Sequence, residues 1–178
     1  MNIEANCEHE NVTALQIAAF SSAVTLEFEL ASGNLGDHRV RLSKSTGRLE
    51  EHTRPTIHVR AAPLDDLVDL VDGALAVKVD TQGAEPFVLS GGRRIFERAD
   101  LVIMEFWPYG IKRMGANVEE IVEYFERKFD ALMISRGDEK LGCAIPIKRA
   151  AAYLRRFGAT RSDDNSFSVD VIGITNPR

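Results

Sequence analysis

Hydrophobic and polar residues alternate in the first third of the chain, as is typical of strands that are buried on one face. Val24–Leu30 alternates apolar residues with threonine and glutamate, which predicts a half-exposed strand. Val12–Ala19 also alternates, and Thr56–Arg60 predicts a short strand that could pair antiparallel with Val24–Leu30 at one side of the sheet. Residues 2–9 are polar and predict the tail of a helix. Residues 31–54 are rich in glycine, serine and charge, and they predict a long loop.

Beyond residue 60, segments with helical spacing alternate with short apolar runs. The predicted helices cover 64–71, 86–98, 117–129 and 148–157, and the predicted strands cover 74–80, 100–106, 131–134 and 168–174. Gly91 and Gly92 interrupt the second of these helices, and Gly158 is well placed to end the last one. This alternation indicates an α/β fold with a mostly parallel sheet.

One strand-to-helix turn carries two acidic residues at the position where α/β sheets bind ligands. The apolar run Ala74–Val77 leads into Lys78 and Asp80, and Glu85 follows the glycine turn at Gly83. The run predicts a strand buried on both faces, with Lys78 and Asp80 on the same face. A buried lysine needs a partner, so we expect a pair of structural or functional role. Glu85 is either part of a site or only a helix cap.

The strand at 100–106 ends in a further acidic residue, Glu105. If this strand lies parallel beside the preceding one, Glu105 and Asp80 open on the same edge of the sheet. Trp107 and Tyr109 follow in what we expect to be an aromatic loop over that edge. Aromatic side chains at such a place suit a small-molecule pocket, and they equally suit ordinary packing.

The composition excludes some classes of partner. The chain has 178 residues and a net charge of −5 at pH 7, which argues against binding of nucleic acid. No apolar run is long enough to span a membrane, so we expect no membrane partner. The cysteines and histidines show no metal-binding spacing, so no metal site is predicted from them. These features together favour a cytoplasmic protein of one domain.

The motifs resemble those of the FkbM family of S-adenosylmethionine-dependent methyltransferases. The family has a Lys-x-Asp-x-(Glu or Gln)-Gly-x-Glu turn after its fourth strand, which here is Lys78–Glu85. Pro63–Leu67 resembles the family's helix entry, and Val102–Glu105 resembles its fifth strand with a terminal glutamate. Val169–Ile172 resembles its closing strand, and Val12–Ala19 its third strand.

The resemblance implies a Rossmann-like methyltransferase sheet, mostly parallel with an antiparallel strand near the C-terminus. In the family, an Asp-x-Gly-Ala-Asn type turn after the first strand binds the donor, and nothing here matches it. We therefore expect residues 1–178 to form a single partial domain without the first two strands, as in a gene fragment or a chain with a misplaced start. Its exposed sheet edges would favour self-association, and the chain alone would bind S-adenosylmethionine weakly or not at all.

The resemblance also implies roles for the candidate residues. The reaction would transfer a methyl group from S-adenosylmethionine to a hydroxyl oxygen of a sugar or secondary metabolite. Asp80 is the first candidate to accept the hydroxyl proton, Glu85 and Glu105 are second candidates, and Lys78 would keep a carboxylate ionised. Glu85 and Glu105 could equally bind substrate or a divalent cation. The remaining assignments are Ala18, Ala19 and Phe20 at the adenine, Asp80 also as a donor-binding residue, and Trp107 and Tyr109 at the acceptor.

The main alternative is a catalytically inactive fragment or pseudoenzyme of the family, which would act as an interaction module. A different α/β enzyme, such as a phosphohydrolase, is weakly supported. No Asp-x-Asp pair follows the strand and no phosphate-binding loop is present.

Overall fold

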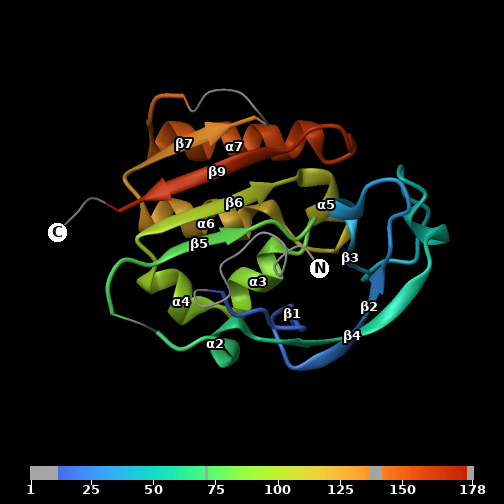
Figure 1. Cartoon of the computed structure of the whole chain (residues 1–178). Coiled ribbons are helices and arrows are strands. Elements are labelled where there is room, and N and C mark those ends of the chain that lie inside the picture. The colour runs from blue at the N-terminus through green and yellow to red at the C-terminus, as the bar shows by residue number, and fades with distance from the viewer. Residues whose placement is uncertain (1–11, 71, 137–141, 176–178) are drawn as a thin grey trace.

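The chain folds into two β-sheets and a set of helices (Figure 1). The structure is a computed structural model, which describes residues 12–70, 72–136 and 142–175. The larger sheet has the order β5-β6-β9-β7-β8, and the smaller sheet has the order β1-β4-β2-β3. The strands of the larger sheet are β5 (Ala76–Val79), β6 (Leu101–Phe106), β7 (Ala131–Ser135), β8 (Ile145–Pro146) and β9 (Val169–Ile174). Those of the smaller sheet are β1 (Ala18–Ala19), β2 (Val24–Glu29), β3 (Arg39–Val40) and β4 (Thr56–Ala62). The α/β class expected from the sequence is confirmed.

The larger sheet is mixed rather than mostly parallel. β5 and β6 are parallel, but β9 lies antiparallel between β6 and β7, and β8 is antiparallel to β7. β5, β6 and β7 therefore point the same way, and the β9 arrow runs against them in Figure 1. The prediction of an antiparallel strand near the C-terminus is confirmed, and its insertion is the reason that most strand pairs are antiparallel.

The smaller sheet is where the sequence pattern was least accurate. The antiparallel pairing of β2 with β4 is confirmed, from Val24 opposite Ala61 to Glu29 opposite Thr56. This pair forms a sheet of its own instead of one side of the larger sheet. The predicted strand 12–19 is reduced to β1, because pairing with β4 involves Ala18 and Ala19 alone. The predicted loop 31–54 contains β3 and two 3-10 turns, at Leu35–Asp37 and Glu51–Thr53.

Local sequence signals account for most helix boundaries. The helices are α2 (Leu64–Leu67), α3 (Glu85–Gly91), α4 (Arg93–Arg98), α5 (Pro108–Arg113), α6 (Val118–Lys128) and α7 (Ile147–Arg161). The Asn117 side chain caps α6 by accepting the Glu119 N–H at 3.0 Å. The predicted break at Gly91–Gly92 separates α3 from α4. No helix in the described part of the chain is long and apolar enough to cross a membrane.

Three helix predictions need correction, and one lies outside the described residues. The helix expected at 64–71 ends at Leu67, since Val68 is already extended. Gly158 lies inside α7, where a Cβ would come within 2.9 Å of Val118, so its role is close packing against α6. The expected aromatic loop after β6 is instead the helix α5, which Pro108 begins. The helix tail expected at residues 2–9 falls outside the described ranges.

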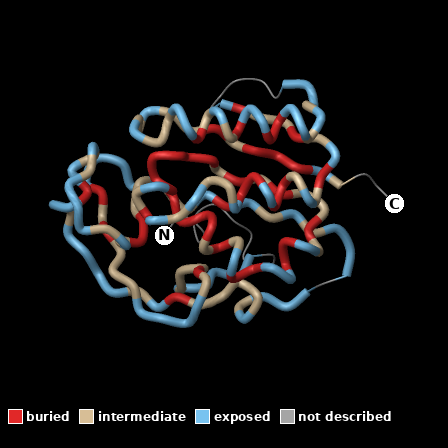
Figure 2. The backbone as a smooth tube through the Cα atoms, turned by 180° about the vertical axis from the view of Figure 1, so that it is seen from behind, coloured by how far each residue is buried: buried red, intermediate tan, exposed pale blue. Residues whose placement is uncertain are grey.

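The main core lies between the larger sheet and its helices. Val102, Met104 and Phe106 of β6 are fully buried, whereas the alternate residues of this strand are half-buried. In Figure 1, α6 and α7 lie behind the sheet, and Figure 2 shows the buried positions concentrated along the central strands. The half-buried face of β6 is therefore the face away from α6 and α7, and the candidate residues of the sheet edge belong to it.

Candidate functional site

Asp80 and Glu105 lie side by side at the carboxyl edge of the parallel pair β5–β6. Lys78 is opposite Ile103 in this pair, and two residues further along each strand Asp80 is level with Glu105 on the same face. The Gln82 side-chain amide donates to both, at 2.9 Å to Asp80 Oδ1 and 3.3 Å to Glu105 Oε2. The prediction that the two acids open on one edge is confirmed.

Lys78 pairs with Asp80, but the strand that carries them is not buried on both faces. Lys78 Nζ lies 3.2 Å from Asp80 Oδ2, and the two side chains are 60% and 42% exposed. β5 is the terminal strand of the larger sheet, and Val79 is its one buried residue. The prediction of a doubly buried strand is wrong because β6 is the single strand that pairs with β5 among the described residues. Solvent therefore reaches both Lys78 and Asp80.

The turn between β5 and α3 has a conformation that fixes the position of Gln82. Gln82 has φ +56° and Gly83 has φ +102°. A Cβ at Gly83 would lie 2.5 Å from the carbonyl carbon of Gly110 in α5, so no other residue fits without displacement. The turn is therefore packed against α5, and its left-handed backbone places the Gln82 amide between the two acids. The sequence analysis assigned no role to Gln82.

Glu85 is bonded to the backbone of this same turn. Its side chain has no exposed surface, and Oε1 accepts the Thr81 N–H at 2.7 Å and the Thr81 hydroxyl at 3.0 Å. The Gly83 N–H donates to both Glu85 oxygens, at 3.2 and 3.0 Å. Burial raises the pKa of Glu85, while these hydrogen bonds oppose the rise. These contacts fit the capping interpretation, in which Glu85 holds the turn.

Glu105 lies in an environment that favours the protonated form of its carboxyl group. Burial raises its pKa to about 8, and the nearby carboxylates of Glu85, Asp80 and Asp170 add to the effect. A hydrogen bond from Ser168 opposes it. Asp170 is the residue of β9 directly opposite Glu105. Glu105 is therefore largely protonated at pH 7, because closely spaced carboxylates cannot all carry a charge in a partly dry site.

The acidic residues do not form a metal centre. Within the described ranges there is no group of three or more histidine, cysteine, aspartate or glutamate side chains that could hold a metal ion. The cation role left open for Glu85 and Glu105 therefore has no support in the arrangement. Proton transfer and hydrogen bonding are the chemistry that these side chains can provide.

The three residues assigned to the adenine lie away from the acids. Phe20 is buried, and its ring stacks on Phe87 at 4.8 Å between centroids. Ala18 lines a hollow of about 530 Å³ with residues of β2 and β4, and Asp80 is not part of that lining. In the described part of the chain, no hydrogen bond, ion pair or ring contact joins Ala18, Ala19 or Phe20 to Asp80. As placed, these residues do not fit one donor pocket shared with Asp80.

Trp107 and Tyr109 are packed between the two sheets. They are 5% and 8% exposed, and the Trp107 indole N–H donates to the Asn165 carbonyl at 3.2 Å. The Tyr109 hydroxyl donates to Glu51 at 2.9 Å and accepts the Arg48 N–H at 2.7 Å. Tyr109 therefore faces the loop of the smaller sheet rather than the Asp80–Glu105 pair.

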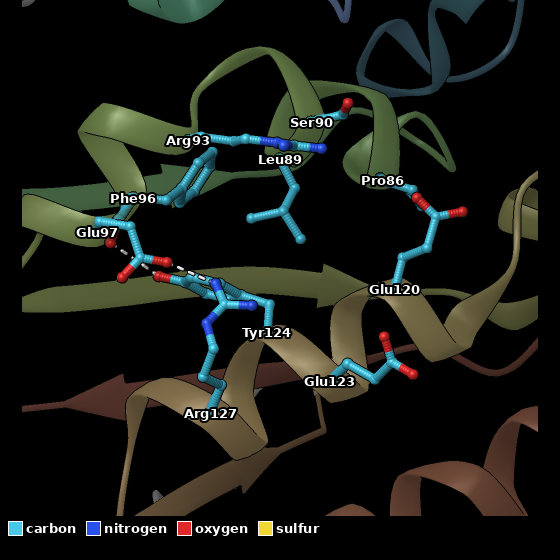
Figure 3. Close-up of a pocket in the computed structure, with 10 residues that line it drawn as sticks. All are labelled: Pro86, Leu89, Ser90, Arg93, Phe96, Glu97, Glu120, Glu123, Tyr124 and Arg127. Carbon is cyan, nitrogen blue, oxygen red and sulfur yellow. Dashed lines mark hydrogen bonds and ion pairs between the residues drawn. The ribbon is translucent and has the colours of Figure 1, made fainter.

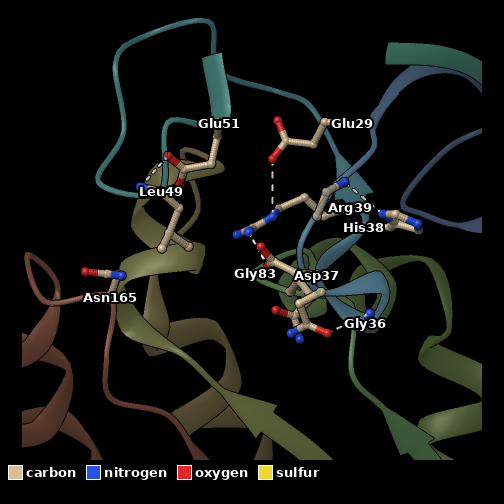
Figure 4. A network of polar contacts seen from close by, with 12 residues as sticks. Glu29, Gly36, Asp37, His38, Arg39, Leu49, Glu51, Gly83 and Asn165 are labelled. Atoms are coloured by element: carbon tan, nitrogen blue, oxygen red, sulfur yellow. Dashed lines mark hydrogen bonds and ion pairs between the residues drawn. The ribbon is translucent and has the colours of Figure 1, made fainter. Parts of the chain in front are cut away.

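A network of charged residues that the sequence analysis missed lies beside the turn (Figure 4). Arg39 is 1% exposed and lies between Glu29, at 3.2 Å, and Asp37. Its guanidinium carbon lies 4.9 Å from the centroid of the Trp107 ring. The alternation in β2 had placed Glu29 on the exposed face, and that expectation is wrong because β3 and its flanking loop cover the residue. Charged residues at every second position, at Asp37, Arg39 and Arg41, were the signal for this network.

Another hollow, of about 500 Å³, lies between α3–α4 and α6 (Figure 3). Its walls include the rings of Phe96 and Tyr124, and Arg127 pairs with Glu97 at its edge. None of the residues assigned to the site belongs to it. The Arg127–Glu97 pair neutralises part of its charge, and no sequence motif points to it.

The chain was also compared with protein-family models, with curated proteins and with solved structures, and none of the three comparisons found a match.

Proposed function

We propose that the chain provides the acceptor side of an S-adenosylmethionine-dependent methyltransferase site, acting on a hydroxyl group of a sugar or secondary metabolite. The observation that carries this proposal is the Asp80–Gln82–Glu105 arrangement at the edge of β5 and β6. It falls in the Lys78–Glu85 motif that resembles the FkbM turn. The antiparallel β9 is also what this resemblance implies for the sheet.

The two acids suit the removal of a proton from a hydroxyl group. A neutral hydroxyl is a poor nucleophile and needs a base within about 3 Å. Asp80 is half-exposed and held by Lys78, so a substrate hydroxyl can reach it. Glu105, with a pKa of about 8, can hold a proton at neutral pH. Two carboxyl groups in different environments can divide the tasks of accepting and donating a proton.

Donor binding is proposed to be weak in this chain alone. Ala18, Ala19 and Phe20 do not share a pocket with Asp80, and the Phe20 ring already stacks on Phe87. The outer edge of β5 carries backbone groups that no described strand pairs with. A further strand could pair at this edge, which is also the observation that favours the alternative function, an interaction module without catalysis.

The first test is a calorimetric titration of the chain with S-adenosylmethionine. A dissociation constant near ~10 µM, roughly −7 kcal/mol, would show that a donor site is assembled and that transfer to sugar hydroxyls can be assayed. In that assay Asp80→Asn should lower kcat/KM by about 100-fold or more, whereas Asp72→Asn, an exposed acid before β5, should leave it within about twofold. Absence of binding into the millimolar range would point to an inactive fragment and favour the alternative over catalysis by this chain.

A further inference from the structure

A hollow of about 620 Å³ lies against α5, the helix that the acidic turn also contacts. Three segments line it, namely the loop that follows β3, the helix α5, and the residues that follow α7. The turn touches α5 at Gly110, through its contact with Gly83, and Tyr109 and Arg113 of α5 line the hollow. A volume of this size can hold a sugar ring or a similar small molecule.

The lining is cationic although the chain is acidic. Arg48, Lys112 and Arg113 supply three positive charges and Asp163 one negative charge, which leaves +2. Counting Glu51, which lies buried behind Arg113, leaves +1. The whole chain carries −5. A local excess of cations on an acidic protein attracts anionic ligands and repels cationic ones.

Arg113 is held in place before any ligand arrives. Its Nε lies 3.3 Å from a buried oxygen of Glu51, and its side chain is 8% exposed. Its Nη2 donates to the Ser45 carbonyl at 3.1 Å. Burial alone would raise the pKa of Glu51, but hydrogen bonds, including one from Tyr109, and the charge of Arg113 outweigh it and lower the pKa. An ionised Glu51 therefore fixes the guanidinium at the wall of the hollow.

A glycine makes this arrangement possible. A Cβ at Gly47 would lie 2.0 Å from a Glu51 oxygen and 2.7 Å from Arg113 Nη1. A side chain at position 47 would therefore displace Glu51 or Arg113 from this ion pair. The Arg48 guanidinium makes no hydrogen bond or ion pair with any residue in the described ranges. Hydrogen bonds from Lys112 to Asp163 and from Ser166 to Asp164 lower the pKa of these two carboxyl groups, and the charge of Arg48 adds to the effect. Arg113 is thus fixed, whereas Arg48 is free to turn toward a ligand.

We infer that this hollow binds an oxyanion group, such as a carboxylate, phosphate or sulfate, on the acceptor molecule. This inference rests on the proposed function, since it names the class of substrate: a hydroxyl compound that also carries a negative charge. Arg113 provides a planar, fixed donor group, and Arg48 adds a charge that is unpaired among the described residues. Lys112 is paired with Asp163 at 2.9 Å, and both side chains are more than half exposed, so its ammonium group can also reach a ligand. The serine hydroxyls of the loop provide hydrogen bonds to the rest of the ligand.

The test is an NMR titration of the full chain with inorganic phosphate, sulfate and D-glucuronate, with D-glucose as the neutral control. We expect saturable shifts at the amides of Gly47, Arg48 and Lys112, with dissociation constants in the range of about 1–10 mM. The double variant Arg48→Gln/Lys112→Gln should weaken binding about tenfold or more. The matched control is Lys44→Gln, because Lys44 is an exposed cation of the same loop that does not line the hollow. It should change binding by less than about twofold.

Preference for glucuronate would identify a sugar acid, and preference for phosphate or sulfate would identify an ester group. Either result supports the inference. Absence of saturable shifts at these amides up to about 50 mM overturns it, as does equal binding of D-glucose or an equal loss of binding in Lys44→Gln. The titration needs neither donor nor methyl transfer. Anion binding without transfer would therefore count against the proposed function alone, and transfer to neutral acceptors without anion binding would count against the inference alone.

Discussion

The two sheets are stabilised by different kinds of contact. The larger sheet and its helices share one apolar cluster, whose fully buried members include Phe106, Phe125 and Leu154. The smaller sheet contributes Val40 to a small apolar cluster that also contains Ala84 and Met114, and its largest buried side chain is that of Arg39. One region is therefore held mainly by removal of apolar surface from water, and the other depends on paired charges.

This difference matters for the candidate sites. Apolar burial is non-directional, so the larger sheet tolerates small changes of shape in its core. Buried ion pairs are directional, and the loss of one partner leaves the other unpaired in a dry environment. The hollow lined by Arg113 is built on the second kind of contact, whereas Asp80 and Glu105 are carried by the first. The two candidate sites should therefore respond differently to substitution.

The largest effect should come from removal of the central cation of the smaller sheet. Arg39→Ala leaves Glu29 and Asp37 with the less buried Arg41 and Arg54 as their remaining cationic partners. The lost buried contacts should lower the free energy of unfolding by about 3 kcal/mol. Urea unfolding measures this loss. Hydrogen exchange should show faster opening of β2–β4 while the core amides of β6 and β9 stay protected.

The control for Arg39→Ala is Arg156→Ala, at an exposed position of α7, which should change the free energy of unfolding by less than about 0.5 kcal/mol. Uniform loss of protection in both sheets after Arg39→Ala would contradict the distinction between the two regions.

The same distinction explains how far the sequence predicted the fold. In the larger sheet, apolar runs and helical periodicity placed β5, β6, β7, β9, α6 and α7 close to their observed positions. In the smaller sheet, the charged residues of segment 31–54 indicated a loop, and the burial of Glu29 and Arg39 was not foreseen. Hydrophobic periodicity reports which apolar residues share a face. It gives no information about ion pairs formed between residues distant in the sequence.

The second prediction concerns the turn between β5 and α3. Gly83→Ala adds a Cβ 2.5 Å from the Gly110 backbone at a positive φ, and it should destabilise the chain by about 2–4 kcal/mol. Gly73→Ala is the matched control, because Gly73 also has a positive φ but no atom within 4 Å of the added Cβ. It should cost only about 1–2 kcal/mol. Equal losses in thermal unfolding would show that packing against α5 does not hold the turn.

The candidate site was predictable only in part. Period-two alternation and the parallel pairing of β5 with β6 were enough to bring Asp80 and Glu105 together. The sequence could not show that Glu85 points back to Thr81 and Gly83, because capping and catalytic glutamates occupy the same position of such turns. Nor could it show that Tyr109 bonds Glu51, since the two residues are 58 positions apart.

The third prediction tests Glu105, the acidic residue near the end of β6. The pKa of Glu105 is about 8 in the folded chain, against an ordinary value of 4.5. The folded state thus binds more protons than the unfolded state between these values, so stability falls as the pH rises from about 4.5 to about 8. Glu105→Gln removes this dependence. Relative to the parent chain, the free energy of unfolding of the variant should therefore rise by about 1–3 kcal/mol between pH 5 and pH 9, after allowance for solvent screening.

Urea unfolding at the two pH values checks this result. Glu123→Gln, an exposed glutamate of α6, should follow the parent chain at both. A parallel pH dependence of Glu105→Gln and the parent chain would show that Glu105 is not the group responsible.

The smallest effect should come from a charge cluster that has the same kind of members as the Arg39 network but is open to water. Arg155 of α7 bridges Glu119 and Glu126 of α6, and these three side chains are 40%, 35% and 36% exposed. Arg155→Ala should shift the urea midpoint by less than about one fifth of the shift caused by Arg39→Ala, because water solvates the two glutamates that remain. In about 1 M NaCl the effect of Arg155→Ala should nearly vanish, whereas that of Arg39→Ala should persist. The opposite result would be an equal loss of stability for both substitutions at low salt and an equal reduction of that loss at high salt. Burial of the ion pairs would then not be what distinguishes the smaller sheet.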